Sequence, residues 1–427
     1  MTATAWALLL VFAGGLFTGV PIAIAIGLAA AVGIYMADFP WVILSQRVIA
    51  GTQVFSLLAI PGFVLTGDLM MHGGLSRRLV AVGQALVRHI TGGLGMVTVI
   101  SATFFAAISG SAPATTAAIG GIMIPEMEKR GWRRDFSASL ATASGPIGQM
   151  IPPSIPMIIW GVVAEESIGK LFLAGIIPGI LIACGLMGVC YVTARRSGIM
   201  TNEKRATWKE LRSALNQGKW SLAAPVVILG GIYGGVFTPT EAAAVGVVYA
   251  LVVGLLIHRE LRPRDLPSIV RRSMRTSTIV CFIIATAAAF GWLVTVEQLP
   301  GTIAGIILGL SDNPIIILLM INVFLLFIGA VMDNIAAMII LGGILTAMGA
   351  NLGLDPTHLG AIVVINLAIG MATPPFGYSL FVGSAISGVP IETMTKTLWP
   401  MLLVMFFVLA LVTYVPWITL AIPRAFG

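Results

Sequence analysis

Long apolar stretches separated by short polar or glycine-rich segments recur along the whole chain. They are continuous and rich in Leu, Ile, Ala and Gly. This pattern predicts membrane-spanning α-helices and not the alternating segments of about 10 residues that build a membrane β-barrel. Because the stretches are spread over the sequence, a cleaved signal peptide does not explain them. Five of them are residues 5–10, 176–192, 226–232, 315–328 and 398–415.

The composition is that of a protein whose main solvent is lipid. Of 427 residues, 58% are hydrophobic and 10% are charged, whereas soluble domains are about 25% charged. The three cysteines lie inside apolar stretches, so we interpret them as small core residues. No histidine or cysteine has the spacing of a metal site. We therefore expect an all-α polytopic membrane protein with no organic cofactor.

The net charge of +7 comes from basic residues that lie between the apolar stretches, mainly in residues 77–88, 129–134, 195–219 and 259–275. Basic residues of short loops stay on the cytoplasmic side of a membrane. We interpret the clusters as this topology signal and not as a nucleic-acid-binding face. The resulting prediction is a bacterial inner-membrane protein with both termini in the periplasm. It leaves three basic residues outside: Arg47, Lys170 and Arg424.

The two halves of the chain share one plan. Shifting the sequence by about 220 residues aligns Gly14–Thr18 with Gly234–Thr238, and Ile151-Pro152-Pro153 with Thr373-Pro374-Pro375. Matches in the same order at nearly constant offset indicate a duplicated unit. We predict a first repeat over residues 1–194, a basic cytoplasmic linker over 195–219, and a second repeat over 220–427.

The distribution of charge predicts that the two repeats have opposite orientations in the membrane. Residues 77–88 are basic, but the matching residues 295–310 contain no basic residue; residues 39–55 contain one, whereas residues 259–275 contain six. A reversal of charge at matching positions indicates inverted repeats. For the linker to be cytoplasmic and the N-terminus periplasmic, each repeat needs about five spans plus one re-entrant hairpin.

Two apolar segments with polar interruptions are the hairpin candidates, residues 94–128 and 315–350. The first is interrupted by Ser109–Thr115 and the second by Gly329–Asn334. Such backbone cannot face lipid, because unsatisfied polar groups cost several kcal/mol in hydrocarbon. A carboxylate such as Asp333 is also expensive at this depth and is functional by default, so we expect it to coordinate a cation. A salt bridge to an arginine is the alternative, although no basic residue lies between Arg275 and Lys396. Small hydroxyl residues that merely allow close helix packing are the alternative for the first tip.

A broken helix is predicted about 40 residues after each hairpin tip, over residues 136–164 and 359–388. Adjacent prolines at 152–153 and 374–375 remove amide donors and interrupt a helix. The break frees carbonyl oxygens that can bind a monovalent cation, and half-helix N-termini can bind an anion. A simple proline kink is the alternative. Asp68 and Glu241 lie near the ends of spans, and we interpret them as interfacial caps or hydrogen-bonding groups.

With these motifs the chain resembles the large membrane (M) subunit of tripartite ATP-independent periplasmic (TRAP) transporters, the DctM family of the ion-transporter superfamily. The likeness covers essentially the whole sequence. One departure follows Asp333, where Asn334 and Ile335 replace the proline or threonine of many relatives. The segments that carry the resemblance are residues 108–111 with 119–127, 151–156, 230–235 with 237–242, and 366–370 with 373–375.

The resemblance implies a sodium-driven elevator in which a transport domain of two hairpins and two broken helices slides against a scaffold. It implies two or more sodium ions, a carboxylate between the tips, a small membrane (Q) subunit and a periplasmic substrate-binding (P) protein. The sodium ligands implied are Ser109, Ser111, Gly145, Gly148, Gly329, Asp333, Gly370 and Thr373. The substrate-binding residues implied are Ser111, Pro152, Pro153, Ser154, Asn334, Pro374 and Pro375.

Sequence reasoning favours sodium-coupled uptake of a small organic acid, such as a C4-dicarboxylate or sialic acid. The main rival is a stand-alone dicarboxylate or citrate symporter of the same superfamily, and an ion channel is a further alternative. A membrane-embedded enzyme is disfavoured, because no acid, histidine or cysteine cluster lies at the membrane midplane with catalytic spacing.

Overall fold

The computed structural model describes residues 2–199, 204–309, 311–375 and 377–426, and these residues form helices and connecting segments without a β-strand. The first-half elements are α1 Ala3–Phe17, α2 Ile22–Met36, α3 Val42–Thr52, η1 Phe55–Leu58, α4 Ala59–His72, α5 Leu75–Val87, α6 Gly93–Ser109, α7 Ala112–Lys129, α8 Arg134–Ser144, α9 Ile147–Met150, α10 Ile155–Val163 and α11 Ile168–Arg196. The second-half elements are α12 Trp208–Tyr233, α13 Pro239–Leu251, η2 Val252–Ile257, η3 Pro263–Asp265, α14 Leu266–Val296, α15 Leu299–Leu308, α16 Pro314–Val331, α17 Asn334–Asn351, α18 Pro356–Gly370, α19 Tyr378–Ser387, α20 Ile391–Tyr414 and α21 Trp417–Phe426.

Seven helical segments of the described chain are long and apolar enough to cross a membrane, and a bent pair, residues 134–150 with 155–163, is an eighth candidate. This is fewer than the ten full spans expected. Several of the remaining apolar helices, among them α1, α2 and α18, have only 10–17 residues, because glycine, proline and turn residues interrupt them. The seven are residues 55–72, 168–196, 239–257, 263–296, 314–331, 334–351 and 391–414.

The helix ends follow local sequence signals. In α13, the Thr238 side chain accepts the Glu241 backbone N–H, and the Glu241 carboxylate accepts the Thr238 N–H. This capping box satisfies two donors that the first turn leaves free. It confirms the interpretation of Glu241 as a cap. Gly110 ends α6 in the left-handed region, at φ +61°, a conformation that glycine adopts without a steric penalty.

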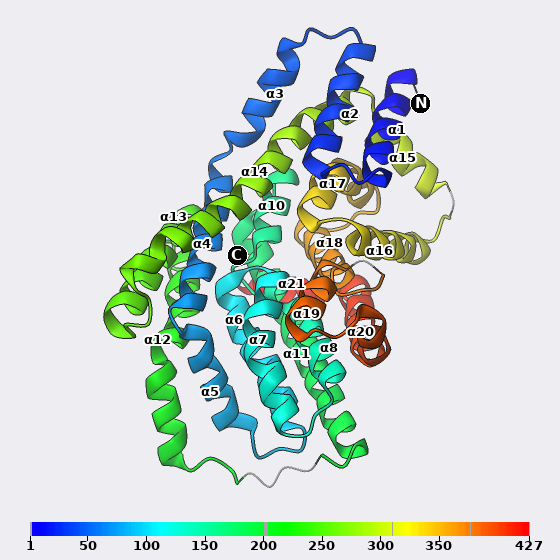
Figure 1. Ribbon diagram of the computed structural model, residues 1–427. Helices are drawn as coiled ribbons and strands as arrows, with labels where there is room; N and C mark the ends of the chain where they lie inside the picture. The colour runs from blue at the N-terminus through cyan, green and yellow to red at the C-terminus, as the bar shows by residue number, and fades with distance from the viewer. Residues whose placement is uncertain (1, 200–203, 310, 376, 427) are drawn as a thin grey trace.

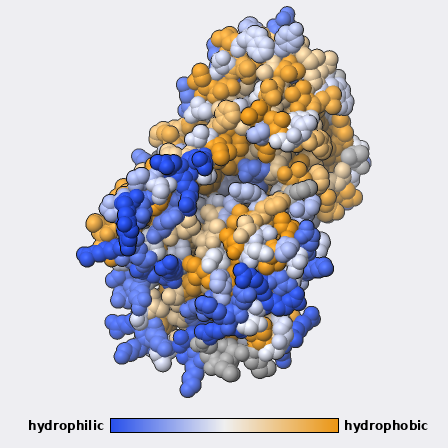
Figure 2. Space-filling view, viewed as in Figure 1, coloured by the Kyte–Doolittle hydropathy of each residue, from blue (hydrophilic) through white to orange (hydrophobic). Residues whose placement is uncertain are grey.

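The molecule is elongated and its two ends differ in polarity. Figure 1 shows α5, the end of α11 and the start of α12 at the lower end, and α1, α2 and α3 at the upper end. Hydrophilic residues gather over the lower part and the left edge of the same face, while the upper part is mostly apolar (Figure 2). The basic linker and the N-terminus therefore lie at opposite ends of the molecule. The assignment of these ends to the two sides of a membrane stays a prediction.

The two expected hairpins differ in the structure. Helices α6 and α7 pack against each other beyond their junction at Gly110 and Ser111. Helices α16 and α17 diverge, with α16 packed mainly on α18 and α17 on α14, α10 and α15. Only the first pair therefore forms a closed hairpin, because α16 and α17 bury their apolar faces against different neighbours. The relation of the two halves as inverted repeats stays a prediction.

Buried side chains form three clusters that connect these elements. One joins α5–α8 with α11 and α20, a second joins α4, α10, α17 and α18, and a third joins α1, α2 and α14. The cysteines only partly follow the expectation. Cys190 is buried in the first cluster, but Cys184 is exposed and Cys281 is half-buried, because both lie on outward faces of helices α11 and α14.

Candidate functional site

A cavity of about 1160 Å³ lies where the two interrupted helix pairs meet helices α2, α4 and α14. One side is formed by the junctions α6–α7, α9–α10, α16–α17 and α18–α19. The opposite side, which we call the α4–α14 wall, contributes residues of α4 and α14. Its polar lining residues in the described chain are Asp68, Ser109, Ser111, Gln149, Arg272, Thr276, Asp333, Asn334 and Tyr378.

Four helices begin at this cavity. The first residues of α10 and α19, Ile155 and Tyr378, line it, as do Pro113 in the first turn of α7 and Asn334 at the start of α17. Helix N-termini carry partial positive charge and unpaired amide donors. Two of them come from each half of the chain, so the arrangement can hold an anion between the halves.

In the first half, the α6–α7 tip contacts the first break directly. Ser109 Oγ and Thr115 Oγ1 lie 2.9 Å apart, and the Ile155 backbone N–H donates to the Gly110 carbonyl oxygen at 3.3 Å. A Cβ on Gly145 would lie 2.9 Å from the Ala112 carbonyl oxygen, and one on Gly148 would lie 2.7 Å from the Ser111 carbonyl oxygen. The two glycines thus allow a close approach of oxygen-bearing backbone.

In the second half, the end of α16 meets the end of α18 backbone to backbone. A Cβ on Gly329 would lie 2.9 Å from the Leu367 carbonyl oxygen, and one on Gly370 would lie 2.7 Å from the Gly329 carbonyl carbon. Asp333 caps α17, where its Oδ2 accepts the Ile335 N–H at 3.0 Å. The structure thus brings Gly329 to Gly370 and each tip to its own break.

The proline pairs shape the breaks without lining the cavity. Both Pro-Pro peptide bonds are cis. Pro152, Pro153 and Ser154 are buried, and Ser154 Oγ donates to the Gln149 carbonyl oxygen at 2.6 Å. Nine residues that were predicted to contact sodium or substrate do not line the cavity. They are Gly145, Gly148, Pro152, Pro153, Ser154, Gly370, Thr373, Pro374 and Pro375. Their direct contact with a ligand stays a prediction.

Sequence reasoning missed Gln149, which links the halves. Its Oε1 accepts the Asn334 Nδ2–H at 2.6 Å across 185 residues, and its Nε2 lies 3.4 Å from Met371 Sδ. Gln149 and Asn334 are both almost fully buried, and Asn334 Oδ1 has no partner in the described chain. The only sign of this residue in the sequence was a side-chain amide within a segment rich in glycine and proline. This amide pair joins the first break to the second tip.

Two residues of the α4–α14 wall have acidic or basic side chains that the sequence analysis did not assign to the site. Asp68 was interpreted as an interfacial cap or a hydrogen-bonding group. Its Oδ2 accepts the Ser273 Oγ–H at 2.5 Å, which confirms the hydrogen bond, and it also lines the cavity. Arg272, the residue before Ser273 on α14, lines the same cavity. Charged groups thus face the two interrupted pairs from across the cavity.

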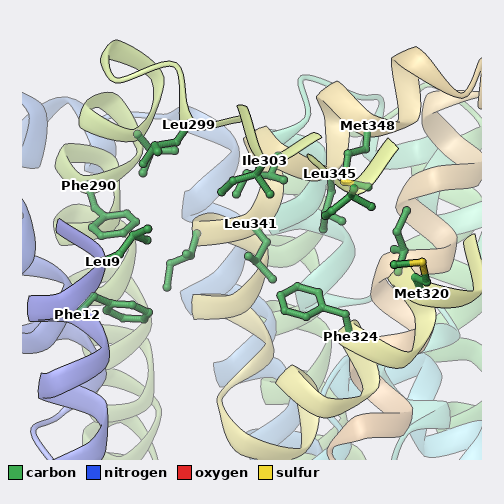
Figure 3. A pocket seen from close by; sticks show the side chains of 15 residues that line it. Leu9, Phe12, Phe290, Leu299, Ile303, Met320, Phe324, Leu341, Leu345 and Met348 are labelled. Atoms are coloured by element: carbon green, nitrogen blue, oxygen red, sulfur yellow. The ribbon is translucent and has the colours of Figure 1, made fainter. Parts of the chain in front are cut away.

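A second cavity, of about 400 Å³, is unsuited to a polar ligand. It lies between α1, α14, α15, α16 and α17, and all of its 15 lining residues are apolar. Figure 3 shows Phe12, Phe290 and Phe324 among the side chains around it. Because a carboxylate loses its hydration there without gaining a hydrogen bond, we assign the functional site to the larger cavity.

Comparisons with known proteins agree with this architecture. Residues 9–418 match the family described as tripartite ATP-independent periplasmic transporter, DctM component. The chain is 38% identical over 414 residues to the sialic acid TRAP transporter large permease protein of Vibrio cholerae, covering 97% of each chain. It is 40% identical over 384 residues to the C4-dicarboxylate TRAP transporter large permease protein of Pseudomonas aeruginosa, covering 90% of each.

Two further similarities concern length and fold. An isethionate TRAP transporter permease protein of Oleidesulfovibrio alaskensis is 44% identical over 417 residues; the match covers 97% of this chain but only 65% of that protein's length. The solved YdaH transporter of Alcanivorax borkumensis shares the fold at a TM-score of 0.66 and 16% identity, covering 89% of this chain and 88% of that one. The family match spans nearly the whole sequence, and the chain therefore belongs to the DctM family of large permease proteins of TRAP transporters.

Proposed function

We propose that this chain is the transport subunit for sodium-coupled uptake of a small organic acid that a periplasmic binding protein delivers. The observation that carries the proposal is the convergence of four helix N-termini, two from each half, on one polar cavity. Their amides and partial positive charge favour a carboxylate or a comparable anion. The named substrates of the relatives, sialic acid, C4-dicarboxylates and isethionate, are all organic anions.

Sodium would act as the co-substrate at two sites. In the first, oxygens around Gly145 and Gly148 are candidate ligands together with Ser109 and Ser111, because hard cations prefer oxygen. In the second, Asp333 supplies a carboxylate beside the closely packed Gly329 and Gly370. Support comes from the short approaches at these glycines, since a cation needs several oxygens within reach.

Substrate would bind between the two sodium sites, at Ser111 and Asn334. Both line the cavity, and each lies at the start of a helix that points its N-terminus into it. The five other predicted substrate contacts surround the breaks and would act by holding the half-helices in place. An elevator movement would carry both tips and both breaks together past the α4–α14 wall. The Gln149–Asn334 hydrogen bond supports their movement as one unit.

The proposed partners are the small membrane subunit and the periplasmic binding protein of the family. The relative from Oleidesulfovibrio alaskensis is named DctMQ, and this chain matches only 65% of its length. Since the relatives are transport permeases, we assign no enzymatic reaction.

Reconstitution into liposomes tests the proposal. The chain would be combined with the small membrane subunit and the binding protein encoded beside it, and uptake of labelled sialic acid, succinate and isethionate measured with and without a sodium gradient. We expect uptake of at least one anion only when sodium and the binding protein are both present. Uptake that does not need sodium would reject the coupling, and sodium-dependent uptake by this chain alone would indicate a stand-alone symporter.

A further inference from the structure

The cavity continues along one face of α14 away from the tips. Its α14 lining residues are Arg272, Thr276, Ile279, Val280, Phe282 and Ile283, and most of them recur at the three- and four-residue spacing of a single helix face. Ile283 belongs to the same buried cluster that Met332 and Ile335 of the second tip pack against. At 1.5 Å per residue, Arg272 lies about 16 Å along α14 from the level of that tip.

Three lining residues of the described chain have an acidic or basic side chain: Asp68, Arg272 and Asp333. Asp333 belongs to the proposed second sodium site. Asp68 accepts a hydrogen bond from Ser273, the neighbour of Arg272. It also lies beside the first tip, since a Cβ on its neighbour Gly67 would lie 3.4 Å from the Ser109 Cα. Arg272 forms no ion pair with the described residues. Its charge is therefore available to an anion in the cavity.

The tendency of basic residues to remain on the cytoplasmic side explains why this part of α14 is positively charged. It does not explain why Arg272 faces the cavity. Arg271 and Arg275 lie within the same turn and carry the same charge, yet neither lines the cavity. Only Arg272 is on the face that continues to the tips. This contrast separates a role in topology, which all three share, from a role in the cavity.

We propose that Arg272 and Asp68 form an electrostatic filter on the α4–α14 wall, through which the substrate anion passes between the tips and the basic side of the protein. This inference rests on the proposed function. Arg272 lies about 16 Å along α14 from the level of the second tip, so it acts on the passing anion and not as a ligand of an anion held at that tip. Arg272 attracts the passing anion, and Asp68, held by Ser273, repels it.

The sign of each effect follows from the charge that is removed. With an effective dielectric constant between about 20 and about 80, one charge at about 16 Å changes the occupancy of a monoanion at the second tip by about 1.5-fold to sixfold. Removing Arg272 lowers this occupancy, and removing the Asp68 charge raises it by a similar factor. A dianion responds by the square of the factor. A residue that merely stabilised the fold would not give opposite signs.

The first test measures the local potential without requiring transport. Thr276→Cys, four residues from Arg272 on the same face, is introduced after replacing Cys184, Cys190 and Cys281 by alanine. Its modification rates are compared for a negatively charged and a positively charged methanethiosulfonate reagent. At about 6 Å in water-like dielectric, Arg272→Gln should shift each rate about threefold in opposite directions, and thus the rate ratio about tenfold. Asp68→Asn should shift it the other way, and the control Arg271→Gln should shift it less than Arg272→Gln does, because Arg271 does not line the cavity.

The second test measures uptake in the reconstituted system. Arg272→Gln should raise the KM for an anion that the unchanged protein transports, Asp68→Asn should lower it, and the double variant should return close to the original value. Arg272→Lys should keep it. If the Arg272→Gln and Arg271→Gln proteins have the same reagent-rate ratio and the same KM, the filter is rejected. If the unchanged protein transports no organic anion, the proposed function is rejected. The comparison of reagent rates then still tests whether Arg272 and Asp68 form the filter.

Discussion

Gly370→Ala is the substitution whose effect on sodium binding the structure predicts most directly. A Cβ on Gly370 would lie 2.7 Å from both the Cα and the carbonyl carbon of Gly329. Because both contacting atoms of Gly329 belong to the backbone, no change of side-chain rotamer can relieve the contact. Reaching the ordinary contact distance of 3.4 Å requires the ends of α16 and α18 to separate by about 0.7 Å. That movement widens the proposed second sodium site beside Asp333.

The expected magnitude follows from the cost of overpacking. Inserting a methyl group into a closely packed contact costs about 1–3 kcal/mol. If this cost falls on the sodium-bound arrangement, sodium affinity decreases by about fivefold to 150-fold. Sodium stabilises the folded protein by mass action, so the melting temperature of purified protein should rise with sodium concentration. The concentration at half of this rise should increase at least fivefold in Gly370→Ala.

Gly121→Ala in α7 is the matched control, because a Cβ there has no atom within 4 Å. Its half-saturating sodium concentration should equal that of the unchanged protein. Gel filtration distinguishes a loss of sodium affinity from misfolding. An unaltered half-saturation in a well-folded Gly370→Ala protein would refute the reasoning, since the close approach of Gly329 and Gly370 would then have no part in binding sodium.

Three further predictions concern individual polar contacts. Asp333→Asn should uncouple uptake from the sodium gradient by removing the carboxylate, seen as a sodium concentration dependence that becomes shallower; a dependence equal to that of the unchanged protein would contradict it. Gln149→Leu leaves the buried Asn334 amide without its partner and should cost about 1–3 kcal/mol, measured by denaturant unfolding, whereas the exposed Gln217→Leu should change little. Hydrogen bonds from the Thr207 backbone and then the nearby Arg88 charge lower the pKa of Glu210, so this cap stabilises the start of α12 above the unfolded pKa of about 4.3. Its stabilisation should be lost only as the pH falls through the lower folded pKa, seen as faster amide exchange in the first turn of α12, and Glu210→Gln should remove this pH dependence.

Much of the architecture can be predicted from short segments of the sequence. The apolar stretches predict helices because each residue contributes to burial in lipid wherever it lies along the chain. Gly110, Ser111 and the proline pairs predict interruptions because backbone conformation and missing amides act within a few residues. The Thr238–Glu241 cap is equally local. These features can therefore be predicted without knowing how the helices pack.

The candidate site depends on both levels. The tips and the breaks were predicted as interruptions from the repeated motifs, and the structure brings Gly329 close to Gly370. The orientation of side chains at the breaks was not. Pro152, Pro153 and Ser154 face the protein interior and not the cavity, because neighbouring helices decide which side of an irregular segment is covered.

Only the tertiary structure decided which distant groups share the cavity. The Gln149–Asn334 hydrogen bond joins residues 185 positions apart, and Asp68 reaches Ser273 across 205. No local pattern encodes such pairs, because they result from how whole helices pack. The same holds for α16 and α17, which diverge to bury their apolar faces on different neighbours. The sequence by itself determined the helices, their interruptions and the family, since these depend on short-range chemistry; the position of every charge relative to the cavity required the packed chain.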